Sequence, residues 1–149
     1  ARSNIFKINK NVSNILKSER KKRLNSIQSC LAFKKDCFLS KKKFRKKIVN
    51  LKKKGLIVAG YAASAKSTTA LNFCKINHKH LDYIADNTKE KIGKFTPGTH
   101  IPIVSIDYFR KNYPNVLLLC SWNHKNEILN KEKKFLKKGG KWISHVKKI

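Results

Sequence analysis

The chain has 149 residues, which is enough for one domain, or for one domain with an appended segment. It carries 36 Lys and Arg residues against 8 Asp and Glu, which gives a formal net charge of +28. No apolar run approaches the roughly 20 residues that cross a bilayer, so we expect no membrane-spanning helix and no membrane partner.

The positive charge is concentrated toward the N-terminus. Residues 1–54 hold 19 Lys and Arg against 2 acids, a difference of +17, whereas residues 55–149 hold 17 against 6, a difference of +11. An excess of positive charge of this size attracts nucleic acid without sequence preference. The chain is also rich in Asn and Ile, which together with Lys are favoured by A/T-rich genomes. We therefore expect only non-specific attraction of nucleic acid.

The cysteines indicate reduced thiols. The four cysteines are Cys30, Cys37, Cys74 and Cys120, and no two of them form a C-x-x-C pair. Reduced cysteines that pack as small hydrophobic side chains are typical of cytoplasmic proteins, which is where we expect this chain. Their spacing relative to the histidines does not match zinc ligands, so we expect no metal site.

The first third of the chain predicts basic helices. We expect disorder over about the first 10 residues, followed by a helical apolar face over residues 12–31 that a basic run at 19–23 interrupts. A second helix is predicted over residues 40–53, with Ser40 as its N-cap and Gly55 just beyond its end. Residues 1–54 are thus a helical lead-in, and residues 55–149 form the main domain.

The stretch from Leu56 to Cys74 is the most informative part of the chain. Leu56–Ala59 predicts a short buried strand, Gly60 breaks it, and a helix is expected over Ala65–Cys74. Small residues at this corner let a phosphate approach the unpaired N–H groups of the helix N-terminus. A diphosphate site is therefore predicted here, formed by Tyr61, Ala62, Ala63, Ser64, Lys66 and Ser67. An ordinary strand-to-helix corner capped by Ser64 explains the pattern equally well.

Two further candidate sites follow later strands. Residues 81–86 predict a second strand that ends at Asp86, where nucleotide folds bind a ribose hydroxyl. A carboxylate that caps the following loop is the alternative interpretation. The polar loop over residues 87–99 is too long for a bare connection and is typical of a ligand-binding loop. The third candidate is Trp122-Asn123-His124, which follows the apolar run 116–120.

The remaining elements complete an alternating order of strands and helices. Strands are expected over residues 101–104, 116–120 and 142–146, with a helix from Ser105 to Asn112 and another up to Lys138. The order indicates an α/β fold: a Rossmann-like parallel sheet with flanking helices, preceded by the basic N-terminal helices. The three candidate sites would then converge at the carboxyl edge of the sheet.

Several motifs in order resemble a known family. They are Gly60–Thr69, Leu71–Cys74, Asp86, Lys91–Ile103, Trp122–Ile128 and Gly139–Ile143. Together they look like the C-terminal domain of the S-adenosylmethionine-dependent C-methyltransferases of nucleotide-linked deoxysugars. The resemblance covers about residues 36–146, and the basic helices before it look like the family's lead-in helix. One departure is Ala62, which stands where the family usually has Gly.

The resemblance implies a three-part enzyme that methylates a carbon next to a keto group. A zinc module and a domain that binds S-adenosylmethionine would precede this domain, which would help to hold the sugar nucleotide. Neither the zinc-binding cysteines nor the glycine-rich methyl-donor motif occurs in this chain. The family's catalytic residues belong to that missing region, so the resemblance implies no catalytic residue here. We expect a C-terminal piece or separately encoded half that binds ligand but does not catalyse alone, and that has a methyl-donor chain as a partner.

The substrate residues follow from the motifs. Asp86 would bind a ribose or sugar hydroxyl, and a ligand-covering loop would comprise Lys91, Pro97, Gly98 and His100. Trp122, Asn123 and His124 would lie at the third strand end. Two other functions remain open: an NAD(P)-type dinucleotide-binding domain, which the missing glycines disfavour, and a basic nucleic-acid-binding module, whose affinity would fall steeply with salt.

Overall fold

The computed structural model describes residues 9–146. The chain divides into two compact units, Ala1–Leu39 and Ser40–Ile149. Most of the N-terminal stretch that we expected to be disordered lies outside the described residues. Among the residues that are described, no helix is long and apolar enough to cross a membrane.

Two helices form the N-terminal part. Helix α1 (Lys10–Lys21) begins at Asn9, whose side chain accepts a hydrogen bond from the backbone N–H of Asn11. A turn at residues 22–26 leads into α2 (Ile27–Lys53), which is continuous over 27 residues. The predicted N-cap at Ser40 is therefore wrong. Residues 27–53 contain neither Gly nor Pro, so nothing in the backbone ends the helix before Lys53.

Within residues 9–146, five short strands form one parallel sheet in the order β3-β2-β1-β4-β5. They are β1 (Val58–Tyr61), β2 (Ile84–Asp86), β3 (Ile103–Ser105), β4 (Val116–Leu119) and β5 (Lys141–Ile143). The predicted α/β fold with a parallel sheet is confirmed, and β1 is the central strand. Most predicted strands were placed too early or made too long.

The largest of these corrections concerns Gly60. We predicted that it ends the first strand, but it lies inside β1 and pairs with Ile84 of β2. A Cβ atom on Gly60 would come within 2.9 Å of the Ile84 side chain and 3.4 Å of the Cys120 sulfur. The glycine is needed because neighbouring strands approach it closely, and the strand continues through it.

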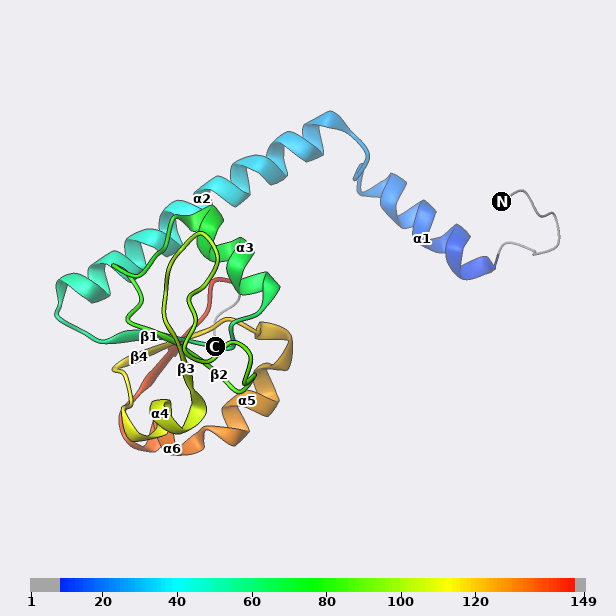
Figure 1. The fold of residues 1–149 in the computed structure, drawn as a ribbon. Coiled ribbons are helices and arrows are strands. Elements are labelled where there is room, and N and C mark those ends of the chain that lie inside the picture. The colour runs from blue at the N-terminus through cyan, green and yellow to red at the C-terminus, as the bar shows by residue number, and fades with distance from the viewer. Residues whose placement is uncertain (1–8, 147–149) are drawn as a thin grey trace. The chain divides into compact units, whose positions relative to one another are not determined.

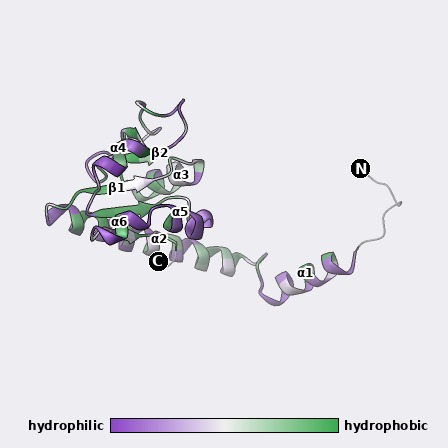
Figure 2. Ribbon diagram, turned by 90° about the horizontal axis from the view of Figure 1, so that it is seen from below, coloured by the Kyte–Doolittle hydropathy of each residue, from purple (hydrophilic) through white to green (hydrophobic). Residues whose placement is uncertain are grey.

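Helices cover both faces of the sheet (Figure 1). The C-terminal half of α2 and α3 (Ala65–Cys74) cover one face, where Phe44, Ile48 and Leu71 are buried. The other face is covered by α4 (Ile106–Lys111), α5 (Lys125–Lys131) and α6 (Lys133–Lys137). Figure 2 shows hydrophobic colour along strands of the sheet and mixed hydrophilic and hydrophobic colour along the helices. These two apolar layers fix the edge at which all five strands end.

The helix boundaries after β1 were predicted better than the strand boundaries. Helix α3 begins and ends at the expected residues, and the Ser105 side chain caps α4 by accepting from the N–H of Tyr108. The single helix expected up to Lys138 is instead divided into a 3-10 turn at Trp122–His124, then α5 and α6. The break between α5 and α6 falls at Glu132, whose side chain points into the core.

Candidate functional site

The candidate site is a pocket at the carboxyl ends of the strands. Strand β1 lies between β2 and β4, and α3 and α4 leave the sheet on opposite faces. This reversal is the topological switch point at which open α/β sheets bind ligands. A pocket of about 360 Å³ opens there, lined from three strand ends by Tyr61, Ala62, Asp86, Asn87, Ser121 and His124. Side chains from α5, namely Glu127, Ile128 and Lys131, complete its wall.

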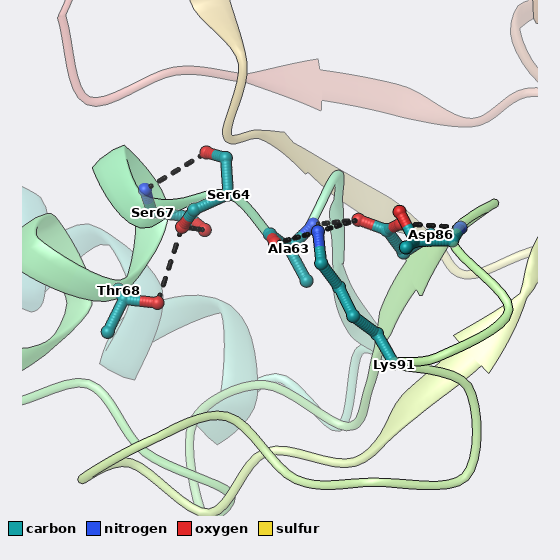
Figure 3. Close-up of polar contacts among 7 residues, drawn as sticks. Ala63, Ser64, Ser67, Thr68, Asp86 and Lys91 are labelled. Atoms are coloured by element: carbon teal, nitrogen blue, oxygen red, sulfur yellow. Dashed lines mark hydrogen bonds and ion pairs between the residues drawn. The ribbon is translucent and has the colours of Figure 1, made fainter.

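The corner after β1 is held by its own hydrogen bonds (Figure 3). The Ser64 hydroxyl accepts from the N–H of Ser67, which confirms the predicted cap. The hydroxyls of Ser67 and Thr68 donate to the Ser64 carbonyl, at 2.6 and 3.3 Å. The Ser67 hydroxyl, which we placed in the predicted diphosphate site, is therefore turned inward, and the neighbouring Thr68 hydroxyl is as well. What remains at this corner are the first N–H groups of α3 and the exposed Lys66, whose ammonium lies 5.7 Å from the Trp122 ring centroid.

Ala62 adopts a left-handed backbone conformation, with φ of 73°. For a residue with a Cβ atom this region costs about 1–2 kcal/mol. The conformation therefore gives a physical reason for the glycine that the resemblance places at this position. The alanine keeps the turn while adding a methyl group to the pocket wall.

Asp86 locks the end of β2 to this corner. One oxygen of its buried carboxylate accepts from the N–H of Ala63 at 2.7 Å, and the other accepts from the N–H of Thr88 at 2.8 Å. Lys91 lies 3.6 Å from the same carboxylate and donates to the Ala63 carbonyl at 2.9 Å (Figure 3). These bonds correspond to the capping alternative, and a role for Asp86 in binding a ribose hydroxyl stays a prediction.

The pKa of Asp86 reflects this network. Burial pushes the pKa upward, but hydrogen bonds from Thr88 and from the backbone N–H of Ala63, together with the charge of Lys91, outweigh burial. The net pKa lies below the ordinary value for an aspartate. The carboxylate is therefore ionised at neutral pH, and it balances the lysine at the edge of the site.

The loop over residues 87–99 is only partly at the pocket. Asn87 lines the pocket, but Pro97 accepts a hydrogen bond from the side chain of Asn72 in the last part of α3, at 3.0 Å. Gly98 packs against the same Asn72 side chain, and the Thr99 carbonyl accepts from the N–H of His78. The structure thus places Pro97, Gly98 and the adjoining His100 beside the end of α3, not with the pocket residues.

The third candidate segment is divided as well. His124 lines the pocket and lies 3.7 Å from Glu127 across one helical turn. Trp122 is about half exposed beside Lys66, and Asn123 is exposed outside the pocket wall. The structure therefore joins Tyr61, Ala62, Asp86 and His124 in one pocket and leaves Lys66 and Trp122 as a pair at its side.

Comparison with known proteins identifies the family. The model of the C-methyltransferase C-terminal domain family matches residues 2–146. The chain belongs to this family. It is also 39% identical over 89 residues to the C-methyltransferase NovU of Streptomyces niveus, an alignment that covers 60% of this chain and 21% of that protein. The chain therefore spans about a fifth of the length of this curated relative.

This C-methyltransferase C-terminal domain contains a polar triad around a buried carboxylate that sequence reasoning missed. The Tyr61 hydroxyl donates to Glu132 at 2.9 Å, and Arg110 pairs with the same carboxylate at 2.8 Å. Glu132 is 1% exposed. Burial and the bond to Glu132 raise the pKa of Tyr61. The phenol is therefore held neutral behind the pocket and cannot serve as a base at neutral pH.

The α5 wall of the pocket was also missed, although the sequence carried a signal for it. His124, Ile128 and Lys131 recur at helical spacing, so a helix that directly follows His124 places them on one face. Residues that hold a metal are not found in the described part of this domain: no three His, Cys, Asp or Glu side chains cluster there. Cys74 and Cys120 are buried, and burial raises the pKa of both thiols, to about 12 for Cys120.

Proposed function

We propose that this domain holds a nucleotide-linked deoxysugar while the rest of a larger enzyme methylates a carbon of the sugar. The observation that carries the proposal is the pocket at the switch point, where residues from three strand ends meet. Membership of the C-methyltransferase C-terminal domain family supports a role in methyl transfer. The family name does not state the acceptor, which we propose from the motifs shared with sugar C-methyltransferases.

The pocket suits the sugar part of such a ligand. Its wall combines apolar atoms of Ala62 and Ile128 with polar groups of Asn87, Ser121 and His124. Hydroxyl and amide groups of this kind orient a sugar by hydrogen bonds, while the apolar surface contacts its ring carbons. His124 is the exposed imidazole on the rim, and we propose that it contacts the substrate.

The methyl donor is proposed to bind outside this chain. The resemblance implies S-adenosylmethionine, but the residues of the corner after β1 do not fit that group. The corner, residues 62–64, has no glycine, because Gly60 lies inside β1, and the carboxylate that a ribose would need already accepts from the N–H groups of Ala63 and Thr88. The same features disfavour an NAD(P)-type site. We therefore propose that the donor and the catalytic base lie in the remainder of the enzyme, and that this domain alone binds without catalysing.

Calorimetric titration of thymidine diphosphate and of a thymidine-diphosphate-linked 4-keto-deoxysugar tests the proposal. We compare the wild type with Asn87→Trp, which fills the rim of the pocket, and with the matched control Asn126→Trp on the exposed side of α5. The expected result is one-to-one binding of the sugar nucleotide that weakens between about 0.15 M and about 1 M salt but is still measurable at the higher concentration. It should be lost in Asn87→Trp and kept in Asn126→Trp.

Two results would count against the proposal. Binding that disappears at high salt and ignores both tryptophan variants would indicate non-specific attraction to a protein of high positive charge. Equal binding of the sugar nucleotide by both variants would exclude the switch-point pocket as its site.

A further inference from the structure

A second hollow lies beside the pocket, between α4 and the α5–α6 pair. It has a volume of about 620 Å³ and is lined by five cationic side chains and one acidic one: Arg110, Lys131, Lys133, Lys134, Lys138 and Glu132. We call it the basic cleft. Nothing in the proposed function so far uses it, and its cations come from α4, from α5, and from α6 with the residue that follows it, which the fold brings together.

The acid inside the basic cleft does not neutralise the lysines. The Glu132 carboxylate is engaged by Arg110 at 2.8 Å and by the Tyr61 hydroxyl at 2.9 Å, so its charge already has partners. Within residues 9–146, no carboxylate pairs with any of the four lysines. Lys134 and Lys138 are one helical turn apart and repel each other. The basic cleft therefore lacks a counter-charge, which a ligand with two or more negative charges would supply.

The basic cleft and the pocket are consecutive parts of one surface. Lys131 lines both of them. On the opposite side, Ile106 at the start of α4 lines the pocket, and Arg110 one turn later lines the basic cleft. A ligand with a neutral end in the pocket can thus extend along α4 and α5 and place an anionic group among the lysines.

The corner after β1, where we predicted the diphosphate from the sequence, offers fewer hydrogen-bond donors and less positive charge to a phosphate. Its Ser67 and Thr68 hydroxyls donate to the Ser64 carbonyl, and a single lysine, Lys66, lies at the helix start. That lysine does not line the pocket. Its ammonium lies 5.7 Å from the Trp122 ring centroid, as that of Lys138 in the basic cleft lies 5.4 Å from the Tyr113 ring centroid, so the ring contacts do not distinguish the two locations. The two locations therefore differ in available positive charge, and the larger charge lies in the basic cleft.

We propose that the basic cleft binds the diphosphate of the nucleotide sugar, with Lys134 and Lys138 as its main contacts. The inference rests on the proposed function and adds to it the place of the phosphates. The sugar occupies the pocket, the diphosphate lies beyond Lys131, and the N-terminus of α3 is not the phosphate site.

Titration with thymidine diphosphate and with inorganic pyrophosphate tests this assignment. The double variant Lys134→Gln/Lys138→Gln removes two cations from the basic cleft. The control Lys125→Gln/Lys137→Gln removes one cation from α5 and one from α6, both outside the basic cleft, so both proteins have the same net charge. A third variant, Lys66→Gln, removes the lysine at the α3 corner. All are compared at about 0.15 M salt, where charges more than about 8 Å apart are screened.

We expect about a tenfold loss of affinity for each charge-assisted contact, hence about a hundredfold weaker binding of both probes by the cleft variant. The control and Lys66→Gln should stay within about twofold of the wild type. The inference is overturned if the control weakens binding as much as the cleft variant, or if Lys66→Gln alone causes the loss. It is also overturned if duplex DNA displaces thymidine diphosphate from the wild type and the control equally. The basic cleft would then attract any polyanion and would not be a specific site for a diphosphate.

The proposed function can fail separately from this inference. If Asn87→Trp abolishes binding of the sugar nucleotide while the cleft variant binds it normally, the pocket assignment stands and the cleft assignment falls. If the wild type binds neither the sugar nucleotide nor thymidine diphosphate, both fall, even where pyrophosphate binds.

Discussion

Glu132→Ala is the substitution whose effect the structure specifies best. The carboxylate is 1% exposed and serves two partners, the Tyr61 hydroxyl and Arg110. Without it, the buried hydroxyl of Tyr61 loses its acceptor, which costs about 1–3 kcal/mol. Arg110 is 41% exposed and can return to water, so loss of the ion pair adds only about 0.5–1 kcal/mol. The truncated side chain removes buried methylene packing as well, for about 1 kcal/mol.

The expected total is a loss of about 3 kcal/mol in the free energy of unfolding. Urea denaturation followed by tryptophan fluorescence measures it. With an m-value of about 1.5 kcal/mol/M, the midpoint should fall by about 2 M. Glu127→Ala is the matched control, because that carboxylate is 77% exposed and its removal should change the free energy by less than about 0.5 kcal/mol.

The double variant Tyr61→Phe/Glu132→Ala separates the two contributions. Removal of the unsatisfied hydroxyl should recover about 1–2 kcal/mol relative to Glu132→Ala alone, since no buried donor is then left without an acceptor. The reasoning is refuted if Glu132→Ala is as stable as the wild type, or if the effects of the two substitutions simply add.

Three other predictions concern the backbone and the pH dependence. Gly140→Ala should lower the free energy of unfolding by about 1–3 kcal/mol, because its Cβ would overlap the buried Phe135 ring; thermal melting measures this, and an unchanged melting temperature contradicts it. Ala62→Gly should leave the free energy of unfolding unchanged or raise it by up to about 1 kcal/mol. Relief of the left-handed φ of 73° offsets the greater freedom of glycine in the unfolded chain. A clear fall in melting temperature would exclude backbone strain at this position. The pKa of Asp86 is lowered in the fold, so its stabilising contribution is complete above the unfolded pKa of about 3.9 and is lost as the pH falls through the lower folded value. The stability gap between wild type and Asp86→Asn should therefore be constant near neutral pH and close only below about pH 4, and a gap that closes on the alkaline side would refute this sign.

The sequence predicted the elements of the main domain better than their edges. Helix α3 was placed correctly because Ser64 is a standard cap and the residues after it favour helix. Gly60 was misread because its effect on a strand depends on what lies beside it. In the folded sheet, the Ile84 side chain of β2 approaches this position so closely that it leaves no room for a Cβ atom, which is why β1 contains a glycine there.

The site was predictable only in part, because local patterns indicate where strands end but not which distant residues contact one another. Residues directly after strands, such as Ala62, Asp86 and His124, follow from the rule that parallel strands end at one edge. The position of Pro97 depends on a hydrogen bond from Asn72, 25 residues earlier in the chain, which no local pattern reveals. The sequence likewise offers no local sign that the Ser67 hydroxyl turns inward to the Ser64 carbonyl.

The sequence by itself determined the parallel α/β fold, the capped corner after β1, and the motifs of a C-methyltransferase C-terminal domain, because these depend on local spacing and residue type. The tertiary structure decided which groups remain available to a ligand. Asp86 is drawn to the N–H of Ala63, Glu132 is buried between Tyr61 and Arg110, and the cations of α4 and α6 line one cleft. These arrangements join residues far apart in the chain, so the balance between burial, hydrogen bonding and charge that sets them exists only in the folded domain.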